Sequence, residues 1–164
     1  MSIAVGLLAA VLAGSQAQVP PVETVIWTPA NAFNGEYRLS IPCSEDEIAA
    51  WRRKANPELA ANGAGCIKSD YAAISILMRN VRPNFFEYLV SKNRDSRVSP
   101  ELMSGRRTLR TLDAPRDGSG EVSTQLIELD KSRALFFFFE AKPAGTVQSR
   151  AIADRFLNSV EFAK

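Results

Sequence analysis

The sequence predicts an α+β fold, with an antiparallel sheet covered by helices and the C-terminal helix packed on the sheet. Three observations lead to this prediction: an apolar–polar alternation at 36–41, two late apolar segments joined by a tight turn, and isolated amphipathic helices. The chain has 164 residues, 46% of them hydrophobic and 23% charged. This composition is typical of a globular chain that can build a core unaided, so we expect no cofactor.

The first seventeen residues carry no charged side chain and contain an apolar run from Ile3 to Leu12. The run is shorter than the roughly 20 apolar residues of a membrane-spanning helix. Ser15 and Ala17 place small residues at the positions that signal peptidase reads. We therefore expect a signal peptide at 1–17, cleaved after Ala17, no transmembrane segment in the mature chain, and a periplasmic or secreted protein. A buried N-terminal helix is the alternative.

The rest of the chain divides into two parts. Residues 18–35 contain several prolines and no hydrophobic period, which indicates an extended lead-in. Residues 36–164 are expected to form a single α+β domain. Its first element is the strand at 36–41, in which alternate side chains are apolar and one face is therefore buried.

Two short helices are expected in the first half of this domain. Ser44 and Glu47 form a capping box at the start of the first helix, and Pro57 ends it. Capping and the helix dipole explain the acidic residues at its start, so they do not indicate a metal site. The second helix is amphipathic and enters at Pro83.

Cys43 and Cys66 are the two cysteines of the chain. Their spacing matches neither a C-x-x-C redox motif nor a zinc knuckle. In an oxidising compartment we expect a disulfide, with two buried thiols as the alternative. Segment 66–80 has an ambiguous period, and a strand is favoured over a helix because antiparallel pairing with 36–41 would bring the two cysteines together.

The second half of the domain is dominated by strands. Residues 106–112 are expected to form one strand, and residues 121–141 form two strands around a tight turn at 130–132. Residues 143–164 close the chain with a helix. Its apolar stripe consists of Ile152, Phe156, Leu157 and Val160.

Four consecutive phenylalanines occupy residues 136–139 of the last predicted strand. Strand alternation puts Phe137 and Phe139 on one face and the other two on the opposite face. All four are buried if the sheet is covered on both sides, by the C-terminal stripe on one side and by 85–90 or the segment around Trp27 on the other. An exposed docking surface is the alternative.

The absence of histidine excludes Ser-His-Asp and Cys-His catalysis and His-bound zinc. No phosphate-binding glycine loop or Ser-x-x-Lys motif is present, so no catalytic residue or metal ligand is nominated. We expect a non-enzymatic accessory or binding protein, and a carboxylate-based hydrolase is a remote alternative. Trp27, Tyr37 and Trp51 are expected in the core, with a pocket lined by them as the alternative.

The middle third of the chain is basic. On the predicted strand, Arg106 and Arg110 share one face and Arg107 lies opposite, a pattern that could bind a small anion or an envelope polymer. An exposed strand protected by its charge is the favoured interpretation. Nucleic acid is not expected, because the basic residues alternate with acidic ones and follow no binding motif. The partner is therefore unknown, with an envelope protein or an anionic ligand as candidates.

Three segments together resemble small exported bacterial proteins with a PsbP-like fold: "FNGEYRLSIPCS", "RALFFFFEAKPAG" and "ADRFLNSVEF". The photosystem II extrinsic subunit and a Ran-binding nuclear import factor share that fold. The resemblance implies an antiparallel sheet packed between helices, with a last helix followed by a short end strand. It implies an accessory or binding role more than catalysis, and it assigns no functional residue.

Overall fold

The computed structural model describes residues 24–31, 35–92, 97–113, 120–142 and 146–164. The predicted signal peptide at 1–17 lies outside these residues. The helices are α1 (Glu45–Lys54), α2 (Pro57–Asn62), α3 (Phe85–Lys92) and α4 (Thr146–Leu157). The strands are β1 (Thr28–Asn31), β2 (Tyr37–Ile41), β3 (Gly63–Ile67), β4 (Tyr71–Arg79), β5 (Arg97–Met103), β6 (Arg106–Asp113), β7 (Glu121–Glu128), β8 (Arg133–Ala141) and β9 (Glu161–Phe162).

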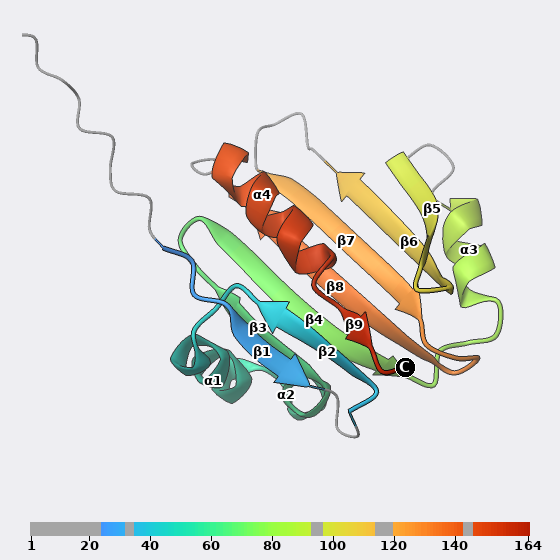
Figure 1. Ribbon diagram of the computed structural model, residues 1–164, viewed down its shortest axis with the longest axis horizontal. Helices are drawn as coiled ribbons and strands as arrows, with labels where there is room; N and C mark the ends of the chain where they lie inside the picture. Colours follow the sequence, from blue (N-terminus) through green and yellow to red (C-terminus); the bar gives the residue numbers. More distant parts are fainter. Residues whose placement is uncertain (1–23, 32–34, 93–96, 114–119, 143–145) are drawn as a thin grey trace, which may run out of the picture.

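Two antiparallel sheets organise these elements (Figure 1). The large sheet has the order β3-β4-β8-β7-β6-β5, and the small one has the order β1-β2-β9. The small sheet and α4 lie side by side on one face of the large sheet, which we call the near face (Figure 1). The α+β prediction, including a C-terminal helix packed on the sheet, is confirmed.

The hairpin of β7 and β8 supplies the centre of the large sheet. Asp130 closes its turn, since one carboxylate oxygen accepts hydrogen bonds from the backbone N–H groups of Ser132 (2.8 Å) and Arg133 (2.9 Å). In β8, Phe137 and Phe139 are fully buried on the near face. Phe156 of α4 packs edge-on to Phe137, with ring centroids 5.2 Å apart. The predicted tight turn and the predicted cover by the C-terminal stripe are both confirmed.

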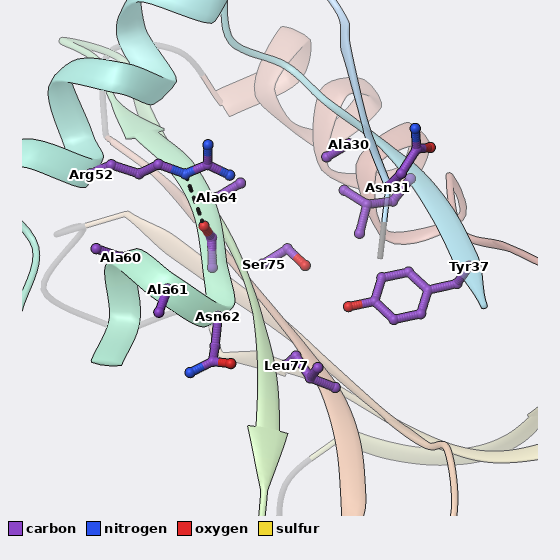
Figure 2. A pocket seen from close by; sticks show the side chains of 12 residues that line it. Ala30, Asn31, Tyr37, Arg52, Ala60, Ala61, Asn62, Ala64, Ser75 and Leu77 are labelled. Atoms are coloured by element: carbon purple, nitrogen blue, oxygen red, sulfur yellow. Dashed lines mark hydrogen bonds between the residues drawn. The ribbon is translucent and has the colours of Figure 1, made fainter. Parts of the chain in front are cut away.

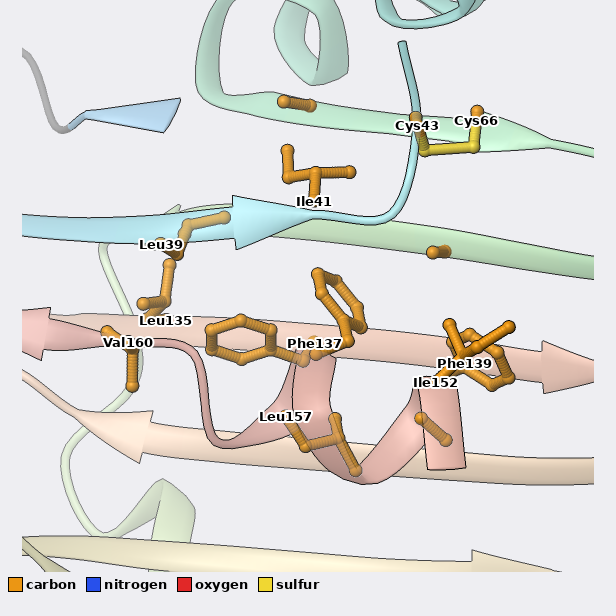
Figure 3. Packing of buried hydrophobic residues seen from close by; sticks show 14 of the residues in the cluster. Leu39, Ile41, Cys43, Cys66, Leu135, Phe137, Phe139, Ile152, Leu157 and Val160 are labelled. Atoms are coloured by element: carbon orange, nitrogen blue, oxygen red, sulfur yellow. A yellow bond between two sulfur atoms is a disulfide. The ribbon is translucent and has the colours of Figure 1, made fainter. Parts of the chain in front are cut away.

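The near-face core continues into the small sheet. Figure 3 shows Phe137 and Phe139 of β8 among side chains contributed by β2 and α4, with Ile41 on one side and Leu157 on the other. The disulfide between Cys43 and Cys66 sits at the edge of this core and joins the end of β2 to β3. The disulfide prediction therefore agrees with the structure.

The opposite face of the large sheet, the far face, is covered only in part. Phe136 lies in a second apolar cluster beneath α3, next to Phe86 and Leu126. Phe136 and Phe138 are both only half-buried, so the expectation that all four phenylalanines are buried is wrong. Trp27 packs against the near-face core and not on the far face, because β1, which follows it, pairs with β2.

Several elements differ from the prediction. Segment 66–80 contains a turn, with the backbone N–H of Lys68 bonded to the carbonyl of Tyr71, so it divides into β3 and β4. Its predicted pairing with β2 is wrong, because the disulfide links two different sheets and needs no strand pairing. The expected lead-in contains strand β1, and β5 was not predicted. Val160 lies beyond the end of α4, although its side chain is buried.

The capping predictions hold in detail. The Ser44 hydroxyl accepts from the Glu47 backbone N–H, and the Glu47 carboxylate accepts from the Ser44 backbone N–H. Pro57 ends α1 and also begins α2, where Asn56 caps the new helix by accepting from the Leu59 N–H. None of the helices in the described part of the chain is long and apolar enough to cross a membrane.

Candidate functional site

A cavity of about 400 Å³ opens between the small sheet, α2 and the near face of β3 and β4. We call it the intersheet cavity (Figure 2). Its volume lies in the range of small-molecule sites, which run from roughly 300 to 1,000 Å³. Its polar lining comes from Asn31, Tyr37, Arg52, Asn62 and Ser75, contributed by five different elements.

Two buried hydroxyl groups face this cavity. Tyr37 is 7% exposed and Ser75 is 4% exposed, yet neither hydroxyl has a hydrogen-bond partner among the described residues. No fully enclosed polar side-chain atom in the described residues lacks a partner, so both oxygens are accessible to solvent, and both residues line the cavity. Figure 2 shows the two hydroxyls pointing toward one another across the cavity, and no hydrogen bond joins them.

The Tyr37 hydroxyl is kept protonated. Burial raises its pKa, and the neighbouring Glu36 carboxylate raises it further. At neutral pH the group is therefore a neutral donor and acceptor, not a phenolate that could act as a base. With Ser75 it offers a pair of hydrogen-bonding sites to whatever occupies the cavity.

Arg52 reaches into the cavity from α1 (Figure 2). Its Nε donates to the carbonyl oxygen of Gly63 at 3.3 Å, which leaves the two terminal NH₂ groups of the guanidinium. Among the described carboxylates, none lies within ion-pair distance of Arg52. It is also the one charged residue of the cavity lining, so the cavity carries a net charge of +1.

The remaining wall is apolar and close-packed. Leu39 and Leu77 line it, together with small alanines of α2 and β3. Gly63 allows α1 and α2 to approach β3, because a Cβ there would lie 2.8 Å from the Leu59 carbonyl oxygen and 3.1 Å from the Trp51 ring. The cavity thus combines an apolar wall, one cation and a few convergent polar groups, which is the usual composition of a ligand site.

The arginines singled out from sequence do not form one site. Arg107 points to the far face and pairs with Glu87 and Glu128. Arg106 and Arg110 share the near face as predicted. Arg106 donates to the Leu129 carbonyl at 2.7 Å and lies over the Phe162 ring.

Arg110 is also engaged within the protein. It donates to the side-chain oxygens of Gln125, at 2.6 Å, and Asn158, at 2.8 Å. The buried Gln125 in turn donates to the Leu157 carbonyl at the end of α4. This network ties the helix to the sheet, so the hydrogen bonds of Arg110 have a structural use.

The three aromatics considered as a pocket lie apart. Tyr37 lines the intersheet cavity. Trp27 stacks on the guanidinium of Arg155, whose Cζ atom lies 4.1 Å from the centre of the Trp27 ring. Trp51 borders a shallow groove of about 460 Å³ between α1 and the far face, beside Ile74 and Ile76. Neither Phe136 nor Phe138 lines this groove, and the docking-surface alternative stays a hypothesis for these two half-buried side chains.

The Glu47 carboxyl does not have the raised pKa of a general acid. Burial raises the pKa of the Glu47 carboxyl, but hydrogen bonds from Ser44 and Lys68 outweigh it, so the pKa is lowered and the group stays ionised. A general acid needs the opposite shift. Within the described ranges, no group of three or more His, Cys, Asp or Glu could hold a metal ion.

Sequence reasoning missed most of the cavity residues. Arg52 lies in the last turn of a helix, where basic residues are common, and Ser75 lies within a strand. Neither carries a local signal for binding. The one available hint was Tyr37, a candidate pocket aromatic, since its hydroxyl would need a partner once buried.

No family model matches the sequence, and no curated protein matches it. Among solved structures, the chain is similar to the cyanobacterial PsbP of Synechocystis, with a TM-score of 0.49 and 9% identity over 92% of this chain and 100% of that one. It is also similar to a protein from Bacteroides thetaiotaomicron, with a TM-score of 0.48 and 7% identity over 83% of this chain. The match covers 48% of the Bacteroides chain, so this chain spans about half its length.

Proposed function

We propose that this protein is an exported, non-enzymatic binding protein that takes a small ligand in the intersheet cavity. The observation that carries the proposal is the pair of buried hydroxyls, Tyr37 and Ser75, that face the cavity without a partner among the described residues. Since both oxygens are open to the cavity, water can satisfy them when the cavity is empty, and a ligand group that makes the same hydrogen bonds can displace that water.

Export is supported by the predicted signal peptide at 1–17 and by the disulfide between Cys43 and Cys66. Structural disulfides persist mainly in oxidising compartments such as the periplasm or the extracellular space. A non-enzymatic role is supported by the chemistry of the cavity, which offers a neutral tyrosine, a serine without a neighbouring base, and an arginine. None of these three groups is activated as a nucleophile or a general base.

The alternative anion site at Arg106 and Arg110 has less support. Both guanidinium groups are already hydrogen-bonded within the protein, and Arg107 faces the other side of the sheet. Arg106 and Arg110 are thus oriented by contacts within the protein, whereas both terminal NH₂ groups of Arg52 are available to a ligand in the intersheet cavity.

The test is a thermal shift of the purified mature protein with the low-molecular-mass fraction of an envelope extract. Ala61, on the exposed side of the cavity wall, is replaced by Trp to fill the cavity from its rim. Ala49, exposed on α1 and outside the cavity, is replaced by Trp as the matched control. The extract should raise the Tm of wild type and Ala49→Trp but not of Ala61→Trp; equal shifts in all three would refute the proposal.

A further inference from the structure

The intersheet cavity carries enough chemistry to define the class of its ligand. We infer that the ligand is a compact monocarboxylic acid with a hydroxyl group at the end opposite its carboxylate. This inference rests on the binding function proposed above. Three observations support it: the charge of the cavity lining, the orientation of the Arg52 guanidinium, and the position of the two hydroxyl groups.

The charge of the lining selects a monoanion. Arg52 is the one charged side chain among the residues that line the cavity, so it can neutralise one negative charge. A phosphate dianion would keep an uncompensated charge beside an apolar wall, which is unfavourable. A neutral ligand would gain no ion pair from Arg52, which is exposed to solvent and needs no counter-charge of its own.

The geometry of Arg52 selects a carboxylate. Its Nε is bonded to the Gly63 carbonyl, so the guanidinium is oriented and only its two terminal NH₂ groups are available. These two groups form a planar fork, which matches the two oxygens of a carboxylate in a bidentate pair.

The hydroxyl pair selects a polar group at the other end of the ligand. Tyr37 and Ser75 point toward one another from β2 and β4, and Arg52 enters from α1 (Figure 2). A ligand hydroxyl between them can donate to one oxygen and accept from the other. It would replace a bridging water without losing hydrogen bonds, a displacement that favours binding.

The apolar wall limits the body of the ligand. Between the polar ends it presents Leu39, Leu77 and the methyl groups of alanines. The cavity volume of about 400 Å³ has room for a short or single-ring body. A compact hydroxy-acid satisfies the cation, the wall and the hydroxyl pair at once.

The test uses three probes that differ by one group each: 4-hydroxybenzoate, benzoate and phenol. Isothermal titration of wild type should give the highest affinity for 4-hydroxybenzoate. Affinity should be at least about tenfold lower for benzoate, which lacks the hydroxyl, and for phenol, which lacks the carboxylate.

Variants then assign each contact. Arg52→Gln should lower the affinity for 4-hydroxybenzoate about tenfold or more and leave phenol unchanged. Ser75→Ala should lower the affinity for 4-hydroxybenzoate and leave benzoate unchanged. Arg53→Gln, one residue further along α1 and outside the cavity lining, should leave all three affinities at the wild-type value.

The inference is overturned if 4-hydroxybenzoate does not bind, if it binds no better than phenol, or if Arg52→Gln and Arg53→Gln behave alike. These results are distinct from failure of the proposed function. If the envelope extract stabilises wild type but not Ala61→Trp while the probes do not bind, the cavity is a ligand site and the ligand class is wrong. If Ala61→Trp responds to the extract like wild type, the binding function itself is contradicted.

Discussion

Replacing each of two buried tyrosines by phenylalanine should have very different effects on stability. Tyr37 is 7% exposed and Tyr71 is 2% exposed, so both substitutions remove one hydroxyl from a buried ring. The Tyr71 hydroxyl donates to the Pro42 carbonyl at 2.5 Å, whereas the Tyr37 hydroxyl has no partner among the described residues. The pair therefore separates a structural hydroxyl from one that is available to a ligand.

The magnitudes follow from the hydrogen bonds. Tyr71→Phe leaves the buried Pro42 carbonyl short of a donor and should lower the free energy of unfolding by about 1 to 3 kcal/mol. Tyr37→Phe removes no internal bond and should change it by less than about 0.5 kcal/mol. Urea unfolding measures both, with the m-value unchanged in each variant. If Tyr37→Phe destabilises the protein as much as Tyr71→Phe, its hydroxyl is used inside the fold and the cavity account fails.

Three further predictions concern the fold. Replacing Cys43 and Cys66 together by alanine should lower the free energy of unfolding by about 3 kcal/mol, measured against wild type in urea, and a loss below about 1 kcal/mol would contradict a stabilising crosslink. Phe137→Ala should lower the free energy of unfolding by about 3 to 5 kcal/mol, and Phe138→Ala should lower it by clearly less, because the first ring is buried and the second is half-buried. Equal losses in the two variants would contradict this difference in burial. Hydrogen bonds from the Ser132 backbone and the Arg133 side chain lower the pKa of Asp130 to about 2 from its usual value near 4. The stabilisation that the ionised Asp130 provides is present above about pH 4 and is lost as the pH falls toward 2. The difference in free energy of unfolding between wild type and Asp130→Asn should therefore vanish across this range in acid-unfolding curves. A difference that stays constant would contradict the lowered pKa.

The parts of the fold that sequence predicts well are those with local signals. Ser44 and Glu47 mark a helix start by direct chemistry, and Asp130 marks the hairpin turn in the same way. The alternation of 136–139 assigns each phenylalanine to a face, because a strand turns each side chain by half a turn. Such features depend on a few neighbouring residues and so are readable without a structure.

The parts that sequence does not predict depend on distant packing. Strand β1 carries no hydrophobic period, and it forms because β2 offers it a partner edge. Phe136 and Phe138 both remain half-buried, because α3 covers only part of the far face. The number of aromatic residues in a strand does not tell how far a helix elsewhere extends over it.

The candidate site belongs to this second group. Arg52, Tyr37 and Ser75 come from α1, β2 and β4, and each has an ordinary structural explanation in its own segment. They meet only because the small sheet packs on the near face of the large one. The arginines on β6 are the opposite case. They lie close together in the sequence and so suggested a binding site, but in the structure each of them bonds to different groups of the protein.

Fluorine NMR of the protein labelled with 3-fluorotyrosine tests the cavity account most directly. The chain has three tyrosines, Tyr37, Tyr71 and Tyr88, so three resonances are expected, each assigned by substitution with phenylalanine. Of these, only Tyr37 lines the intersheet cavity. Addition of the low-molecular-mass envelope fraction should shift the Tyr37 resonance in wild type, leave the other two in place, and have no effect in Ala61→Trp. A Tyr37 resonance that stays fixed while the extract raises the Tm of wild type would contradict the account.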